Sequence, residues 1–185
     1  MFNNRVPVCR WAAALFPFVL MLSGCPRILS IDYQPSNTIK GEGTIQIGPF
    51  RYMPFENGQV HAKQVQLNTQ AAGSLYLSED VAAFFAEALR RELASSGYQV
   101  EPEDQRSLGG SVDRFYLDWI DAAEMTFDMS VTYIVRHGDR VVYTDKVSCQ
   151  ANRPKSLMAD SAIIRDATKE CIIQFIQTAQ GAKAL

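Results

Sequence analysis

The sequence predicts an α+β domain, with a mainly antiparallel sheet of about four to five strands and two amphipathic helices on one face. Two segments, 79–97 and 156–180, repeat apolar residues at helical spacing. Segments between 109 and 150 alternate apolar and polar residues, as half-buried strands do. Because such strands leave one apolar face to be covered, packing both helices on that face is the economical arrangement.

The start of the chain has the features of a secretory signal. Arg5 and Arg10 form a basic lead, and twelve uncharged residues follow, from Trp11 to Leu22. This run is too short for a membrane-spanning helix, which needs about 20 apolar residues. It has the length and flanks of the apolar region of a signal peptide. We therefore predict that residues 1–24 are a lipoprotein signal peptide.

The signal ends in Leu22, Ser23, Gly24 and Cys25, which resemble the bacterial lipobox. In that family the cysteine thiol receives diacylglycerol, the chain is cut before it, and the new amino group is acylated. Small residues before the cysteine let a lipid-modifying active site approach the sulfur. The alternative is an ordinary signal peptide with an incidental cysteine. We predict lipidation at Cys25, and Pro26 in place of aspartate resembles an outer-membrane sorting address.

The rest of the chain has the size of one domain. Without the signal, sixteen basic and twenty acidic residues remain, evenly mixed. This mixture argues against a nucleic acid partner, which requires a basic face. It also provides no polybasic patch, so a lipid anchor would have to attach the protein to the membrane. We predict a lipidated tether over residues 25–40, on which Ile31 and Tyr33 can dock, and a single periplasmic α+β domain over 41–185.

The first elements of the domain follow from local patterns. Residues 43–55 alternate as a strand, with a Gly-Pro step at Gly48 that can host a bulge. Residues 56–72 are expected to be mostly loop. A helix over 79–97 is expected, with Ser78 as its N-cap, Glu79 and Asp80 in its first turn, and Gly97 at its C-terminal end.

The second half is expected to hold most of the sheet. Residues 98–100 suggest a short strand, and 109–121 a longer one whose two initial glycines permit a turn or bulge. Residues 125–150 predict a hairpin with its turn at Gly138 and Asp139. Pro154 ends the last strand, and a helix follows over about 156–180.

Two cysteines remain in the domain. Cys149 lies on the apolar face of the last strand, and Cys171 on the apolar stripe of the last helix. Both should point into one sheet–helix interface, in a compartment where disulfides persist. We predict a disulfide between them, and the alternative is two buried free thiols.

Residues with catalytic chemistry are sparse. His61 and His137 lack a second ligand at metal-binding spacing, and both are expected in exposed turns. Paired carboxylates such as Asp118 and Glu124 can cut glycosidic bonds, but Asp113 is expected on the strand face opposite Asp118. We therefore predict that the protein is not an enzyme and needs no metal or cofactor.

Three segments together resemble the YajG-type family of small envelope lipoproteins: 81–100, 108–119 and the hairpin through Val147. The resemblance implies a compact α+β domain similar to the N-terminal domain of TolB, and no catalytic residues. Auxiliary lipoproteins of envelope lipid transporters are similar in layout.

These observations lead to a functional expectation. We expect a non-enzymatic outer-membrane lipoprotein whose periplasmic domain binds an envelope protein or a lipid-linked component. Tyr52, Phe55 and Tyr76, which flank the irregular segment, are the predicted partner-binding residues, since aromatic side chains dominate interface energetics. The alternative is that these three side chains cover the edge of the core. The alternatives are an accessory lipoprotein of a lipid or lipopolysaccharide transport system and, less favoured, a cell-wall hydrolase.

Overall fold

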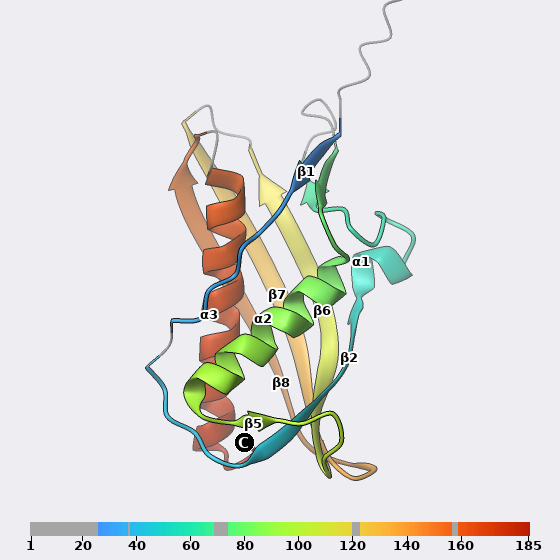
Figure 1. Cartoon of the computed structure of the whole chain (residues 1–185). Helices are drawn as coiled ribbons and strands as arrows, with labels where there is room; N and C mark the ends of the chain where they lie inside the picture. The colour runs from blue at the N-terminus through green and yellow to red at the C-terminus, as the bar shows by residue number, and fades with distance from the viewer. Residues whose placement is uncertain (1–25, 37, 69–73, 120–122, 157–158) are drawn as a thin grey trace, which may run out of the picture.

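We describe the protein from a computed structural model (Figure 1). The structure describes residues 26–36, 38–68, 74–119, 123–156 and 159–185. The predicted signal peptide and Cys25 lie outside these residues.

The main sheet is curled and mixed, so the prediction of a mainly antiparallel sheet is only partly correct. Its strands run in the order β5 (Gln99–Val100), β2 (Thr44–Tyr52), β6 (Arg106–Asp118), β7 (Glu124–His137) and β8 (Arg140–Pro154). The short β3 (Gln66–Leu67) also pairs with β6. Pairs on the β2 side are parallel, and β6–β7 and β7–β8 are antiparallel. A long connection containing α2 separates β2 from its neighbours β5 and β6, which makes parallel pairing possible.

The hairpin and the short strand at 99–100 confirm the sequence predictions. The turn between β7 and β8 falls at the predicted Gly138, whose φ is +58°. The last strand ends at Pro154, as predicted. A hairpin can be predicted from local sequence because two strands joined by a tight turn can pair only in the antiparallel direction.

The predicted bulge in the first strand is confirmed, and it lies where two strands approach closely. The pairing of β2 with β6 shifts register between Ile47 and Phe50. Opposite this shift, a Cβ on Gly109 would lie 2.9 Å from the carbonyl oxygen of Pro49, and one on Gly110 would overlap the carbonyl oxygen of Thr132. The two glycines are therefore required inside β6 by the backbones on both sides of it. The sequence predicts the two glycines only at the start of the strand, where they would permit a turn or bulge.

Helix α2 (Val81–Ser96) begins later than the sequence suggested. Its N-cap is Asp80, in extended conformation, so the predicted cap at Ser78 is wrong. The Ser78 N–H instead donates to the Leu29 carbonyl, 2.8 Å away, which keeps Ser78 beside β1 and out of the helix. The other end is as predicted: Gly97 has φ +101° and closes the helix.

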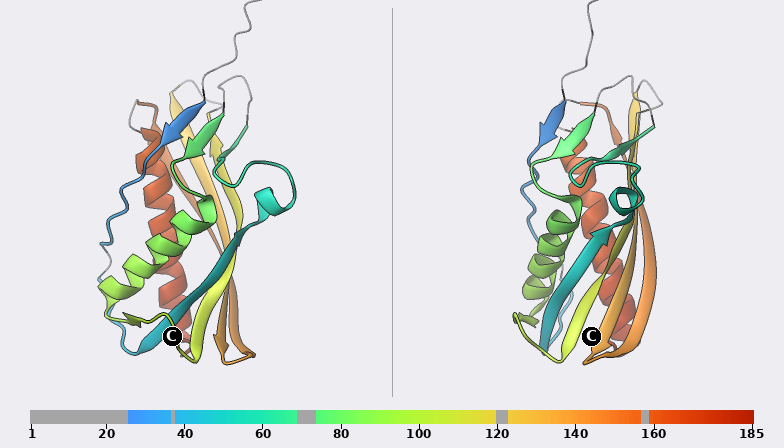
Figure 2. Two further views of the ribbon diagram at one scale, coloured as in Figure 1. Left: turned by 45° about the vertical axis from the view of Figure 1, so that its right-hand side comes forward. Right: turned by 90° about the vertical axis from the view of Figure 1, so that its right-hand side faces the viewer.

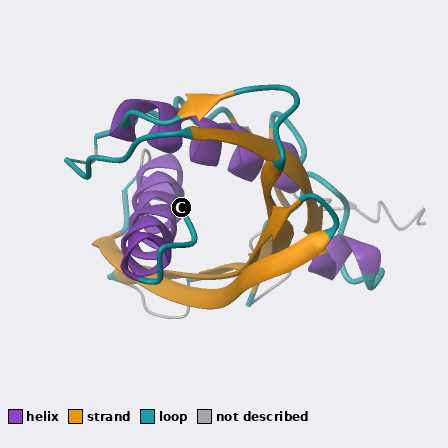
Figure 3. Ribbon diagram, turned by 90° about the horizontal axis from the view of Figure 1, so that it is seen from below, coloured by secondary structure: helices purple, strands orange, loops and turns teal. Residues whose placement is uncertain are grey.

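The two long helices, α2 and α3 (Ala159–Gly181), lie inside the curve of the sheet (Figure 3). Between them and the strands is a single hydrophobic core. At its centre the ring of Tyr133 from β7 stacks on Phe175 from α3, with centroids 3.9 Å apart. A third, short helix that the sequence did not predict, α1 (Met53–Glu56), follows β2 directly.

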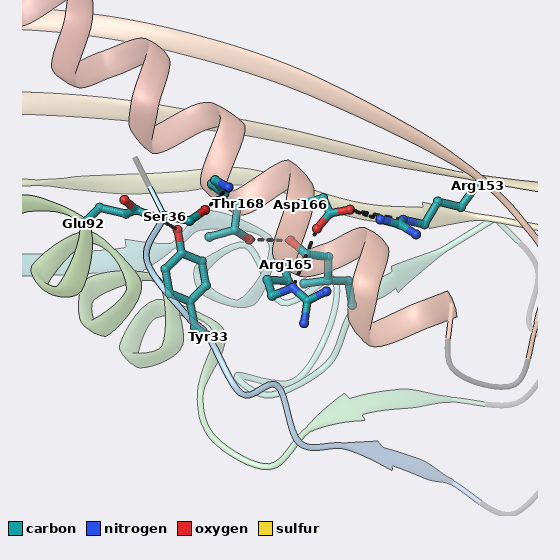
Figure 4. A network of polar contacts seen from close by, with 9 residues as sticks. Tyr33, Ser36, Glu92, Arg153, Arg165, Asp166 and Thr168 are labelled. Carbon is teal, nitrogen blue, oxygen red and sulfur yellow. Dashed lines mark hydrogen bonds and ion pairs between the residues drawn. The ribbon is translucent and has the colours of Figure 1, made fainter. Parts of the chain in front are cut away.

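A second, small sheet lies at one end of the molecule. Strand β1 (Arg27–Leu29) pairs in parallel with β4 (Leu75–Leu77). The chain then runs along the helices to β2, as Figures 1 and 2 show. Tyr33 is buried there, and its hydroxyl donates to the buried carboxylate of Glu92 at 2.8 Å (Figure 4). Much of the segment predicted as a tether is thus packed against the domain, and Tyr33 docks as expected.

Candidate functional site: an open groove beside β2

The three aromatic residues predicted to bind a partner have different environments. Tyr52 is only 3% exposed, and its hydroxyl donates to the Gln64 carbonyl at 2.9 Å, so it is not an exposed contact residue. It ends β2 with its ring turned inward against Phe115, and burial raises the pKa of its phenol. Phe55 on α1 is 45% exposed, as the prediction required. Tyr76 is half-buried beside the ring of His61.

A groove that the sequence did not predict runs between β2 and α2. Its β2 wall is formed by residues 47–50, and its α2 wall is formed by small side chains. Ala83 is exposed, and Ala82 and Ala86 are half-buried. The lining residues are Ile47, Gly48, Pro49, Phe50, Asp80, Ala82, Ala83, Ala86 and Arg90. The groove therefore has a mixed lining, in which the apolar side chains of Ile47, Phe50 and the alanines accompany the charged groups of Asp80 and Arg90.

The groove exists because β2 has few partners on its outer side. Strand β5 pairs with β2 only at Thr44 and Ile45. Beyond that point α2 is the neighbour, and its methyl groups are too short to fill the space beside Ile47 and Pro49. Phe50 fills the inner side, with its ring edge-to-face against Phe85 at 5.0 Å. Small side chains on a helix let an occupant approach its backbone closely.

Charge is distributed unevenly along the groove. Asp80 lies at the first end of α2 and Arg90 ten residues further on, a distance of about 15 Å along the helix axis. Arg90 contacts Glu87 at 3.4 Å, and both side chains are about half exposed. Exposed pairs of this kind are weak, so an occupant's carboxylate could replace Glu87 as the partner of Arg90.

The opposite edge of the sheet is closed by covalent and polar contacts. Cys149 of β8 and Cys171 of α3 form a disulfide, with Cα atoms 5.6 Å apart. On either side of it Arg153 pairs with Asp166 (Figure 4), and Thr178 donates to Asp145 at 2.9 Å. Helix α3 is therefore held to β8 along several turns.

The acidic residues that a hydrolase would use lie on the polar outer face of the sheet. A bulge in β6 between Val112 and Arg114 turns Asp113 outward, so the expectation that it opposes Asp118 is wrong. Asp113 accepts hydrogen bonds from Ser111 and Thr132, both at 2.6 Å. Burial alone would raise the pKa of Asp113, but these hydroxyls and Lys146 hold it below its usual range.

Asp118 and Glu124 have different environments. Asp118 accepts a hydrogen bond from Asn68 at 2.6 Å, and Glu124 is exposed at the start of β7. His61 and His137 are both exposed. Within the described ranges, no three His, Cys, Asp or Glu residues gather as a metal site. Among those same residues, no helix is long and apolar enough to cross a bilayer.

Comparisons with known proteins identify the fold. No family model matches the chain, and no curated protein matches its sequence. A Xanthomonas campestris protein of the DUF330 family superposes with a TM-score of 0.64 at 12% identity, covering 85% of this chain and 99% of its own. An uncharacterized protein gives 0.55 at 10% identity, with the same coverage. A minor lipoprotein of Acinetobacter baumannii gives 0.46 at 10% identity, covering 76% and 92%. The chain therefore shares the fold of the DUF330 protein, and membership of the YajG-type family stays a prediction.

Proposed function

We propose that this protein is a lipoprotein of the bacterial outer membrane, anchored through Cys25, whose periplasmic domain binds a segment of an envelope protein in the β2–α2 groove. It acts by binding and not by catalysis. The observation that carries the binding role is the groove itself, an open depression beside β2 in which the small side chains of α2 leave space next to the strand. The anchoring role rests on the lipobox behind a basic lead and an apolar run.

The chemistry of the groove specifies its occupant. An apolar side chain would fit between Ile47 and the alanines of α2. A basic group would suit the Asp80 end, and an acidic group would suit Arg90. An extended peptide covers the 15 Å between these charges with about five residues. The expected partner segment is therefore short and extended, with an apolar residue between opposite charges.

A role as accessory lipoprotein of an envelope lipid or lipopolysaccharide transport system is the second candidate. It requires a surface for acyl chains. The concave side of the sheet is filled by core side chains, including the Tyr133–Phe175 stack, so the β2–α2 groove is the candidate surface for an acyl chain. This role therefore predicts that the purified domain carries lipid that is lost when the groove is filled.

Site-specific photocrosslinking in intact cells tests the binding role. A photoreactive amino acid replaces Ala83 in the groove and, as a matched control, Ala94, which is also exposed on α2 but lies outside the groove. A third position, Phe55, tests the exposed aromatic of α1. We expect one discrete protein adduct at Ala83, identified by mass spectrometry as an envelope protein, and none at Ala94.

The charge requirement gives a second arm. Arg90→Glu should weaken the Ala83 adduct several-fold, because the acidic part of the partner would meet a like charge. The proposal fails if Ala83 and Ala94 give the same pattern of adducts. A lipid adduct at Ala83 would favour the transport role instead.

A further inference from the structure

The first described residues leave almost no free chain between the predicted anchor and the domain. The structure describes the chain from Pro26, and β1 begins at Arg27. Three Cα–Cα steps separate Cys25 from Ile28, which is about 11 Å at full extension. Whatever holds Cys25 therefore holds β1 at nearly the same place.

Strand β1 is firmly attached to the domain. The Arg27 N–H donates to the Ser74 carbonyl at 3.0 Å, and its guanidinium donates to Asp160 at 2.6 Å. Asp160 is buried and Arg27 also lies over the ring of Trp119. Burial raises the pKa of Asp160, while the Arg27 charge opposes that rise. Arg27 thus contacts β4, α3 and the end of β6 at once.

The chain after β1 is held as well. Tyr33 is buried and bonded to Glu92, and its carbonyl accepts a hydrogen bond from Arg91 at 2.9 Å. The described part of segment 26–40 therefore behaves as part of the domain and cannot act as a long spacer.

The small β1–β4 sheet has an inner and an outer face. Leu75 and Leu77 are buried on the inner face. Ile28 and Tyr76 face each other in register between them, on the outer side. Ile28 is 71% exposed, more than any other large hydrophobic residue of the described chain, and Tyr76 is half-buried. An aliphatic side chain beside a tyrosine is the composition that favours the boundary between lipid and water.

We infer that the outer face of the β1–β4 sheet, with Ile28 and Tyr76, lies on the periplasmic surface of the membrane that holds the Cys25 anchor, and that this contact fixes the orientation of the domain. The inference rests on the proposed lipidation. The interfacial layer in which apolar side chains bury is about 5–10 Å deep, within reach of the 11 Å of chain. The tyrosine predicted to contact a protein partner would contact lipid instead.

A fixed orientation directs the far end of the molecule away from the membrane. The β1–β4 sheet and the β7–β8 hairpin lie at opposite ends in all three side views (Figures 1 and 2). Twelve residues of β8 separate Val142 from Pro154, or about 40 Å. The hairpin tip, where Val142 is 49% exposed, would therefore stand clear of the lipid.

Quenching of tryptophan emission by brominated phospholipid tests this orientation. The full lipoprotein is reconstituted into phosphatidylcholine vesicles with or without brominated acyl chains. Ile28→Trp is compared with Val142→Trp at the tip, both in a Trp119→Phe background, because Trp119 is the one tryptophan after the signal. We expect Ile28→Trp to lose most of its emission in brominated vesicles and Val142→Trp to lose none.

Two controls separate this inference from the proposed anchor. Flotation with vesicles reports anchoring alone: a protein that does not float contradicts the lipid anchor. A protein that floats but shows no quenching at position 28 contradicts the fixed orientation and leaves the anchor intact. The chain without these substitutions supplies a second readout, since Trp119 lies beside Arg27 and should be partly quenched.

Discussion

The sheet has a long helix near each of its two sides, and the two helix–strand contacts differ. On one side α3 is joined to β8 by the Cys149–Cys171 disulfide and by polar contacts that flank it. On the other side α2 presents alanines to β2 and leaves a groove. Phe175 on the α3 side is fully buried, whereas Phe50 beside the groove is half-buried.

The two contacts are expected to serve different purposes: the α3–β8 contact stabilises the fold, and the β2–α2 groove binds a partner. A sealed contact contributes to the free energy of unfolding, and the hollow along α3 between Asp166 and Gln177 is mostly polar. An open contact contributes less but leaves apolar surface available for binding. Changes on the closed side should therefore lower stability, and changes in the groove should alter binding at nearly constant stability.

The largest effect is expected from truncating the stacked ring on the closed side. Phe175→Ala should lower the free energy of unfolding by about 3–5 kcal/mol, because it removes a fully buried ring and leaves a cavity. Phe50→Ala should cost clearly less, since part of that ring is already in water. Urea denaturation followed by circular dichroism measures both. Equal losses of unfolding free energy in the two variants would contradict the difference between the α3–β8 contact and the β2–α2 groove.

Loss of the disulfide comes next. It closes a loop with a sequence separation of 22, so opening it should cost about 3 kcal/mol. The double variant Cys149→Ala, Cys171→Ala should show this loss in denaturation experiments and keep the groove adduct at Ala83. Thiol titration of the unfolded, unreduced mature protein should find neither cysteine free. Two reactive thiols would contradict the bond.

A smaller, pH-dependent effect on stability is expected at Asp113, on the outer face of the sheet. The pKa of Asp113 is lowered in the folded protein from its usual value of 3.8, so its ionised form stabilises the fold. This contribution is complete above that value and is lost as pH falls through the lower, folded-state pKa. Asp113→Asn should therefore be less stable than the wild type at pH 7, and the gap should close in acid. The exposed Asp139→Asn provides a control that should show no such gap.

The smallest effect on stability is expected in the groove. Ala83→Arg should change the free energy of unfolding by no more than about 0.5 kcal/mol, because the residue is exposed and lies on a helix. Ala94→Arg should behave alike. Only Ala83→Arg should prevent copurification of the partner identified by crosslinking. Loss of copurification in both variants would place the binding surface elsewhere.

Short-range patterns predicted much of the fold. The hairpin turn at Gly138, the end of α2 at Gly97 and the break at Pro154 follow from local backbone preferences, and all are confirmed. Long-range features did not follow. The Ser78 cap is wrong because the backbone at Ser78 is held beside β1, which is distant in sequence, and the helix begins only after Asp80. The parallel pairs were missed because the residue pattern of a strand does not reveal the direction of its neighbour.

The candidate site was harder to predict. Tyr52 flanks the irregular segment and was predicted among the exposed aromatic residues, but it is buried, as in the alternative that these side chains cover the edge of the core. The groove left one signal in the sequence, the alanines at 82, 83 and 86 at the start of α2, although Ala88 and Ala94 follow in the same helix. Small residues on a helix also occur where helices pack, so only the positions of β2 and α2 show that this face is open.

The lipid on Cys25 is the central claim, and intact mass spectrometry of the protein extracted from membranes tests it most directly. The account predicts a chain that starts at Cys25 and carries the added mass of diacylglycerol and an amide-linked acyl group. A mature protein with an unmodified amino terminus, or one recovered wholly from the aqueous fraction, would contradict it.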